Sequence, residues 1–96
     1  MAPGAAYDAK RGMLVVFGGS GPDGYFGDTW GWDGSTWTRL AETGPAPRVM
    51  GAMAWDARRE VIVMFGGRNG WPDGDLNDTW EWDGTRWREI TPPSAR

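Results

Sequence analysis

Chemistry in this chain has to come from carboxylates, guanidinium groups and aromatic rings, because its 96 residues include no histidine and no cysteine. Without histidine the chain lacks the commonest general base and the commonest ligand of transition metals. Without cysteine it has no thiolate nucleophile, no disulfide and no cysteine-type zinc site. The sequence therefore predicts no catalytic residue, no metal site and no cofactor.

Two arginines are the first candidate binding residues. Arg48 and Arg96 lie 48 positions apart, each at the end of one half of the chain. Guanidinium groups gathered around a channel hold an anion through charge-assisted, often bidentate hydrogen bonds. The competing interpretation is structural, with each arginine paired to a nearby carboxylate such as Asp28 or Asp78.

Aromatic residues in two long loops, residues 20–28 and 68–78, are the second candidate group. We interpret Tyr25 and Trp71 as binding residues, because aromatic side chains dominate binding energies. Phe26 aligns with Leu76 and is interpreted as an anchor of its own loop. No pair of carboxylates stands out as the acid and nucleophile of a glycosidase.

Composition narrows the class of protein. The net charge is −3 with both signs interspersed, so neither a nucleic-acid surface nor a polybasic membrane patch is expected. No apolar run approaches the roughly 20 residues of a membrane span, and no signal peptide is recognisable. Glycine (16) and proline (7) indicate many turns, while eight tryptophans argue against disorder. We expect a soluble protein and assign no compartment.

The sequence contains an internal repeat, so the segments that carry the candidate binding residues occur twice. Residues 5–19 align with residues 53–67 at a spacing of 48, and residues 28–37 align with residues 78–87 at a spacing of 50. The chain therefore divides into two units, residues 1–48 and 49–96.

Each unit contains four segments with strand character, separated by turn residues. Small residues dominate the first segment and apolar residues the second, while the third alternates tryptophan with other residues and the fourth is half polar. This gradient is typical of a wedge-shaped propeller blade, an antiparallel sheet with a crowded inner strand and a solvated outer one. The predicted strands are Gly4–Tyr7, Met13–Phe17, Thr29–Trp32 and Trp37–Leu40 in the first unit, and Gly51–Trp55, Val61–Phe65, Thr79–Trp82 and Trp87–Ile90 in the second.

Both units resemble the kelch family over essentially the whole chain. The shared motifs are a Phe-Gly-Gly after the second strand, a Trp-Asp-Gly after the third and a tryptophan in the fourth, at Phe17–Gly19, Trp32–Gly34 and Trp37, and again at Phe65–Gly67, Trp82–Gly84 and Trp87. The resemblance implies an all-β fold with two four-stranded antiparallel blades of a β-propeller. Some members of the family are copper oxidases with histidine ligands and a cysteine-modified tyrosine, and this chain has neither residue type.

Two blades are too few for a closed ring, because propellers typically have four to eight. Assembly of several copies would cover the two outer faces, since the second blade of one copy could pack on the first blade of the next. Residues 94–96 followed by Met1 of a second copy would imitate residues 46–48 followed by Val49. We expect a homotrimer with six blades, with a homotetramer of eight blades as the alternative, and an anion in the central channel.

The predicted function is that of a self-assembling propeller scaffold without catalytic activity. The division at whole repeats suits either a part excised from a longer propeller or a designed, engineered building block. The alternative function is a protein- or carbohydrate-binding module that uses its loop face and central channel.

Overall fold

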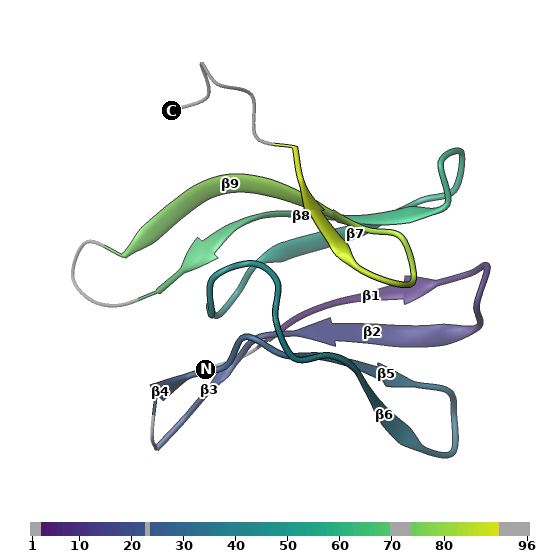
Figure 1. The fold of residues 1–96 in the computed structure, drawn as a ribbon, viewed down its shortest axis with the longest axis horizontal. Helices are drawn as coiled ribbons and strands as arrows, with labels where there is room; N and C mark the ends of the chain where they lie inside the picture. Colours follow the sequence, from purple (N-terminus) through teal and green to yellow (C-terminus); the bar gives the residue numbers. More distant parts are fainter. Residues whose placement is uncertain (1–2, 23, 70–73, 91–96) are drawn as a thin grey trace.

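The computed structural model describes residues 3–22, 24–69 and 74–90. Within these residues it is all-β and has no helix (Figure 1). Two four-stranded antiparallel sheets and one short hairpin contain the strands β1 (Gly4–Asp8), β2 (Met13–Phe17), β3 (Ser20–Gly21), β4 (Gly24–Tyr25), β5 (Thr29–Trp32), β6 (Trp37–Ala41), β7 (Ala52–Asp56), β8 (Val61–Arg68), β9 (Asp75–Trp82) and β10 (Trp87–Glu89).

Each half of the chain forms one sheet whose neighbouring strands are antiparallel, as the sequence predicts. The first sheet has the order β1-β2-β5-β6, and the second has the order β7-β8-β9-β10. Asp33-Gly34 and Asp83-Gly84 make the predicted tight turns after the third main strand. Gly34 has a φ of 102° and Gly84 a φ of 98°, a region that glycine reaches without a steric penalty.

The two halves differ most after the Phe-Gly-Gly motif, where the sequence predicted long loops in both. In the first half the chain leaves the sheet, and β3 and β4 form a separate two-stranded hairpin. In the second half β8 and β9 continue to pair as far as Arg68 and Asp75, past an irregularity between Phe65 and Gly67. At this point of the first half the N–H of Gly19 is bonded to the carbonyl of Arg48 at 2.8 Å, and the carbonyl of Gly19 accepts from the N–H of Phe26 at 2.9 Å.

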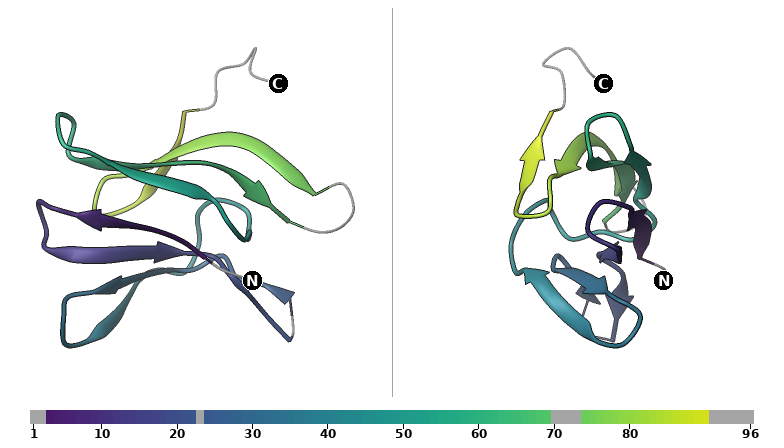
Figure 2. Two further views of the ribbon diagram at one scale, coloured as in Figure 1. Left: turned by 180° about the vertical axis from the view of Figure 1, so that it is seen from behind. Right: turned by 90° about the vertical axis from the view of Figure 1, so that its right-hand side faces the viewer.

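The sheets meet through their inner strands, and their hairpin turns gather at one end of the molecule (Figure 2). Gly4 of β1 fits there because a Cβ would lie 2.5 Å from the carbonyl oxygen of Gly51. This close approach explains why β1 begins with glycine. No helix of the described residues is long and apolar enough to cross a membrane.

Apolar side chains from both sheets fill the contact between them, which we call the joint. The ring of Trp87 lies 5.4 Å from that of Phe17, edge to face, and 5.4 Å from that of Trp82. The indole N–H of Trp87 donates to Thr29 Oγ1 at 2.8 Å. The joint thus joins the fourth strand of the second sheet to the middle of the first. Its fully or almost fully buried apolar residues are Val15, Phe17, Ile62, Met64, Trp82 and Trp87.

Candidate assembly faces

Arg48 lies in the linker before β7 and is completely buried. Its Nη1 and Nη2 donate to the two carboxylate oxygens of Asp78 at 2.7 and 2.8 Å. Nη1 also donates to the carbonyl of Gly66 at 2.9 Å, and Nε to that of Ala46 at 3.0 Å. The guanidinium of Arg48 therefore binds groups of its own chain, which agrees with the structural interpretation that it pairs with a nearby carboxylate. This pairing leaves the expected anion site without the contribution of Arg48.

Asp78 has a second partner in its own strand. The indole N–H of Trp80 donates to it at 2.7 Å, and the pKa of the carboxyl is lowered, chiefly by the hydrogen bonds from Arg48. In the first half Asp28 accepts from the indole of Trp30 at 2.8 Å. Residues two apart in a strand lie on the same side of it, which places the carboxylate and the indole of each Asp-Thr-Trp sequence next to each other.

Tyr25 lies in β4 and is half-buried on the wall of an open groove of about 550 Å³. Phe26 lines the same groove and rests on the hairpin, since a Cβ at Gly21 would lie 2.9 Å from its Cζ. This contact agrees with the predicted anchoring role of Phe26. Glu42 and Arg39 form an ion pair of 3.3 Å in the groove wall. Trp71 and Arg96, the other two candidate binding residues, lie outside the described residues.

Each sheet has one face in the joint and one face that packs on no other sheet among the described residues. The strand registers place the side chains of the free face of the first sheet together: Tyr7, Leu14, Val16, Trp30, Trp32 and Trp37. They do the same for the free face of the second sheet: Ala54, Val61, Val63, Phe65, Thr79 and Glu81. These two faces are candidate contact surfaces of the chain.

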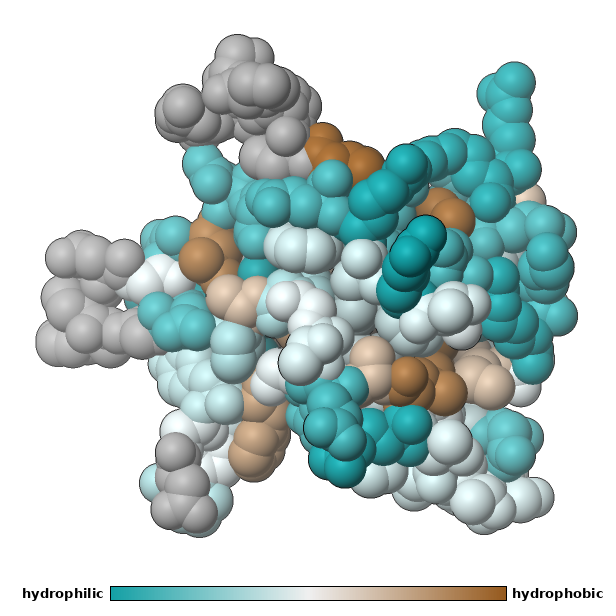
Figure 3. All heavy atoms as spheres, viewed as in Figure 1, coloured by the Kyte–Doolittle hydropathy of each residue, from teal (hydrophilic) through white to brown (hydrophobic). Residues whose placement is uncertain are grey.

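Aromatic residues on the free faces are more exposed to solvent than the residues at equivalent positions of the repeat that lie in the joint. Phe17 is 1% exposed in the joint, whereas Phe65, which lies 48 positions later, is 53% exposed. Trp87 is 9% exposed, whereas Trp37, which lies 50 positions earlier, is 49% exposed. Hydrophobic side chains reach the surface at several separate places on the side shown in Figure 3. The free faces thus expose residue types that the joint buries.

One charged cluster on the free face of the second sheet has no counterpart in the first sheet and was not predicted from the sequence. Glu81 is only 3% exposed. It accepts from Arg59 at 2.7 Å and from Arg88 at 3.1 Å. The hydrogen bond from Arg59 is the main cause that lowers the pKa of Glu81, and the same bond raises the pKa of Arg59. The equivalent residue is Gly31, so the repeat gave no signal for the cluster.

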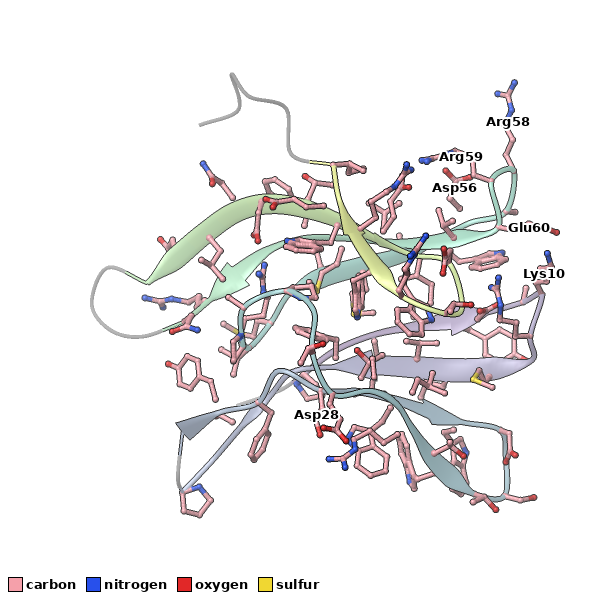
Figure 4. All side chains as sticks on the ribbon, viewed as in Figure 1. Lys10, Asp28, Asp56, Arg58, Arg59 and Glu60 are labelled. Carbon is pink, nitrogen blue, oxygen red and sulfur yellow. The ribbon has the colours of Figure 1, made fainter. Side chains whose placement is uncertain are left out.

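Charged side chains also connect the two sheets at the end where the hairpin turns gather. Lys10 Nζ and Glu60 Oε1 are 3.0 Å apart, and the two side chains face each other (Figure 4). Arg11 donates to Asp8 of its own sheet at 2.7 Å and to the main-chain carbonyl of Asp83 in the other sheet. This end of the joint is therefore polar, whereas its middle is aromatic.

Among the described residues no three acidic side chains gather into a group that could hold a metal ion. The carboxylates of Asp78 and Glu81 form ion pairs with arginines. A comparison of the sequence with models of protein families gives no match, and a comparison with curated proteins gives none either.

Proposed function

We propose that the chain is a building block of a self-assembling, kelch-like β-propeller and has no catalytic activity. In this proposal each sheet is one blade, residues 1–48 and 49–96 are the two units, and three copies close a ring of six blades. Four copies with eight blades are the alternative. The free face of the second sheet of one copy packs on the free face of the first sheet of the next.

A single observation carries the proposal: the exposed aromatic residues of the free faces are repeat equivalents of residues that fill the joint. Tyr7, Trp37 and Phe65 are exposed large side chains. Their equivalents are Trp55, Trp87 and Phe17, in the same order. A contact between copies that repeats the joint would bury all three.

The contact is a head-to-tail one, because its two sides are different surfaces. In the joint the tryptophan face of the second sheet covers the Phe17 face of the first. The tryptophan face that remains free belongs to the first sheet, and the phenylalanine face that remains free belongs to the second. Head-to-tail contacts form closed rings when the rotation between copies closes.

The mass of the particle in solution tests the proposal. Native mass spectrometry or light scattering should give the mass of three chains, or of four for the eight-bladed alternative. Trp37→Ala should weaken association. Roughly 100 Å² of its surface remains to be buried, which at about 25 cal/mol per Å² is worth roughly 2.5 kcal/mol, or about 60-fold in affinity.

Phe26→Ala is the matched control, because Phe26 is a similarly exposed aromatic residue that packs on its own hairpin and not in the joint. It should leave the particle mass unchanged. A folded wild-type monomer at high concentration would contradict the proposal. So would a Trp37→Ala protein that assembles like the wild type.

Asp28 is a further polar element of this contact. It occupies the position that Asp78 has in the second half, where Arg48 binds it. Arg96 is the repeat equivalent of Arg48 in the sequence. We expect Arg96 of one copy to bind Asp28 of the next.

The groove beside β4 supports a second candidate function, the binding of a carbohydrate. One side of the Phe26 ring rests on Gly21 while the side chain stays half exposed, which suits stacking against a sugar ring. Asp28, Arg39 and Glu42 line the groove and offer hydrogen-bonding groups. A glycan array followed by calorimetry tests this function. Binding that Phe26→Ala removes would support it, and an array without any binding would exclude it.

A further inference from the structure

Besides the ion pair of Lys10 with Glu60, the turn end of the joint has a directed hydrogen bond from Arg11. Arg11 lies in the turn between β1 and β2, and its guanidinium reaches the turn between β9 and β10 in the other sheet. There Nη2 donates to the carbonyl oxygen of Asp83. We call the extended side chain of Arg11 the arm. A Cβ at Gly84 would overlap it, so glycine leaves the space that the arm occupies.

The arm has an equivalent in the second sheet. Arg59 lies 48 positions after Arg11, in the turn between β7 and β8. Both turns have the same hydrogen bonds: Asp8 Oδ1 accepts from the backbone N–H of Arg11 at 2.9 Å, and Asp56 Oδ1 accepts from that of Arg59 at 3.2 Å. The two arms therefore leave their sheets from the same local geometry.

The receiving turn has an equivalent in the first sheet. Asp33 Oδ1 accepts from the backbone N–H of Thr36 at 2.8 Å, and Asp83 Oδ1 accepts from that of Arg86 at 3.0 Å. Apart from Gly34 itself and its two chain neighbours, no residue that the structure describes has an atom within 4 Å of a Cβ built at Gly34. The turn at Asp33-Gly34 thus has the shape of the occupied turn and an open space where the arm would lie.

We propose that Arg59 of one copy reaches the Asp33-Gly34 turn of a second copy and donates a hydrogen bond to the carbonyl oxygen of Asp33. The inference rests on the proposed assembly and names a residue contact that sets its geometry. Phe65 and Trp37 supply most of the buried apolar surface, while the arm specifies which turn of the second copy lies beside it. A directed hydrogen bond does this better than apolar contact, which is not directional.

Glu81 is the positioning residue of the arm. Arg11 binds a carboxylate of its own sheet, Asp8, and the carbonyl of Asp83 at the same time. Arg59 binds Glu81 of its own sheet and, like any arginine, has five N–H groups in a planar fork. It can therefore keep its bond to Glu81 while another N–H donates to the second copy.

Two adjacent arginines provide a matched test. Arg58 precedes Arg59 in the same turn, and its side chain points away from the rest of the chain (Figure 4). Arg59→Gln should weaken association about tenfold or more, the effect of losing one charge-assisted hydrogen bond. Arg58→Gln removes the same charge from the same turn and should leave the dissociation constant within about twofold. Sedimentation velocity across a concentration series measures both.

A pair of glycine variants tests the receiving turn and is independent of whether Arg59→Gln folds well. Gly34→Asn and Gly84→Asn introduce the same side chain at nearly the same positive φ. Only Gly84→Asn collides with an arginine inside the chain, so it should lower the melting temperature further. Gly34→Asn should leave the chain folded and weaken association.

The outcomes separate this inference from the assembly itself. A wild-type protein that stays monomeric refutes the proposed function and with it the arm. A wild-type ring that Arg59→Gln and Gly34→Asn leave as tight as before keeps the assembly and refutes the arm. Equal weakening by Arg58→Gln and Arg59→Gln also refutes the arm, because it would show a general effect of charge.

Discussion

Replacing Asp78 with asparagine should destabilise the chain strongly, because the change leaves a buried guanidinium without its counterion. Arg48 is completely buried and gives two of its hydrogen bonds to the carboxylate of Asp78. An asparagine amide offers one oxygen, and its NH₂ group would be set against the N–H groups of Arg48. The asparagine is neutral, so it cannot balance the charge.

The size of the effect follows from the burial of the pair. Breaking a buried ion pair by removing one partner costs about 3 to 5 kcal/mol. The Asp78 side chain is 22% exposed, so some water reaches the site and the lower end of the range applies. A loss of about 3 kcal/mol lowers the melting temperature of a domain of this size by roughly 12 to 24 °C.

Asp28→Asn is the control for this prediction. Within the described part of the chain the side-chain partner of Asp28 is the indole of Trp30, and an asparagine oxygen can still accept that N–H. The control should cost no more than about 1 kcal/mol. Urea unfolding followed by tryptophan fluorescence measures both variants, at protein concentrations too low for association.

Two results would refute the reasoning about Arg48. One is a loss below about 1 kcal/mol for Asp78→Asn, which would mean that the guanidinium finds water or another acceptor. The other is an equal loss for Asp28→Asn, which would attribute the effect to the Asp-Thr-Trp sequence and not to the ion pair.

Two further predictions concern acid and the contact between copies. The pKa values of Asp78 and Glu81 are lowered in the folded chain. Their stabilising effect is therefore present above the pKa of the unfolded chain and is lost as the pH falls through the pKa of the folded chain. The free energy of unfolding should drop below about pH 4, and urea unfolding that is unchanged down to about pH 2 would contradict this. For the proposed pair between copies, Asp28→Arg or Arg96→Asp alone should weaken assembly, while both changes in one chain should restore it, as measured by particle mass. Failure of the double variant to recover would count against that pair.

Local chemistry made most of the fold predictable. Met13–Phe17 and Thr29–Trp32 form strands with the predicted bounds, since an apolar run and an alternating run each suit a sheet. The Asp-Gly pairs make turns because glycine reaches positive φ freely. The continuation of β8 to Arg68 was missed, because pairing beyond Gly67 depends on Leu76 in the next strand, on the far side of a loop.

The candidate site was less predictable than the fold. Tyr25 does line a groove, but the groove also needs Phe26 on its hairpin and the linker that follows β6. The buried cluster around Glu81 had no signal in the repeat, because its counterpart is glycine. Arg48 had two interpretations in the sequence, and only the position of Asp78 in the fold decides between them.

The sequence by itself determined the two repeats, their strands, their turns and the absence of histidine and cysteine chemistry. These depend on residue type and spacing, which act over a few neighbouring residues. Only the tertiary structure decided which face of each sheet is packed and which is free, because both faces of these strands carry apolar residues. It alone showed that Phe65 and Trp37 stay exposed while Phe17 and Trp87 are buried, since that difference arises from contacts between residues far apart in the chain.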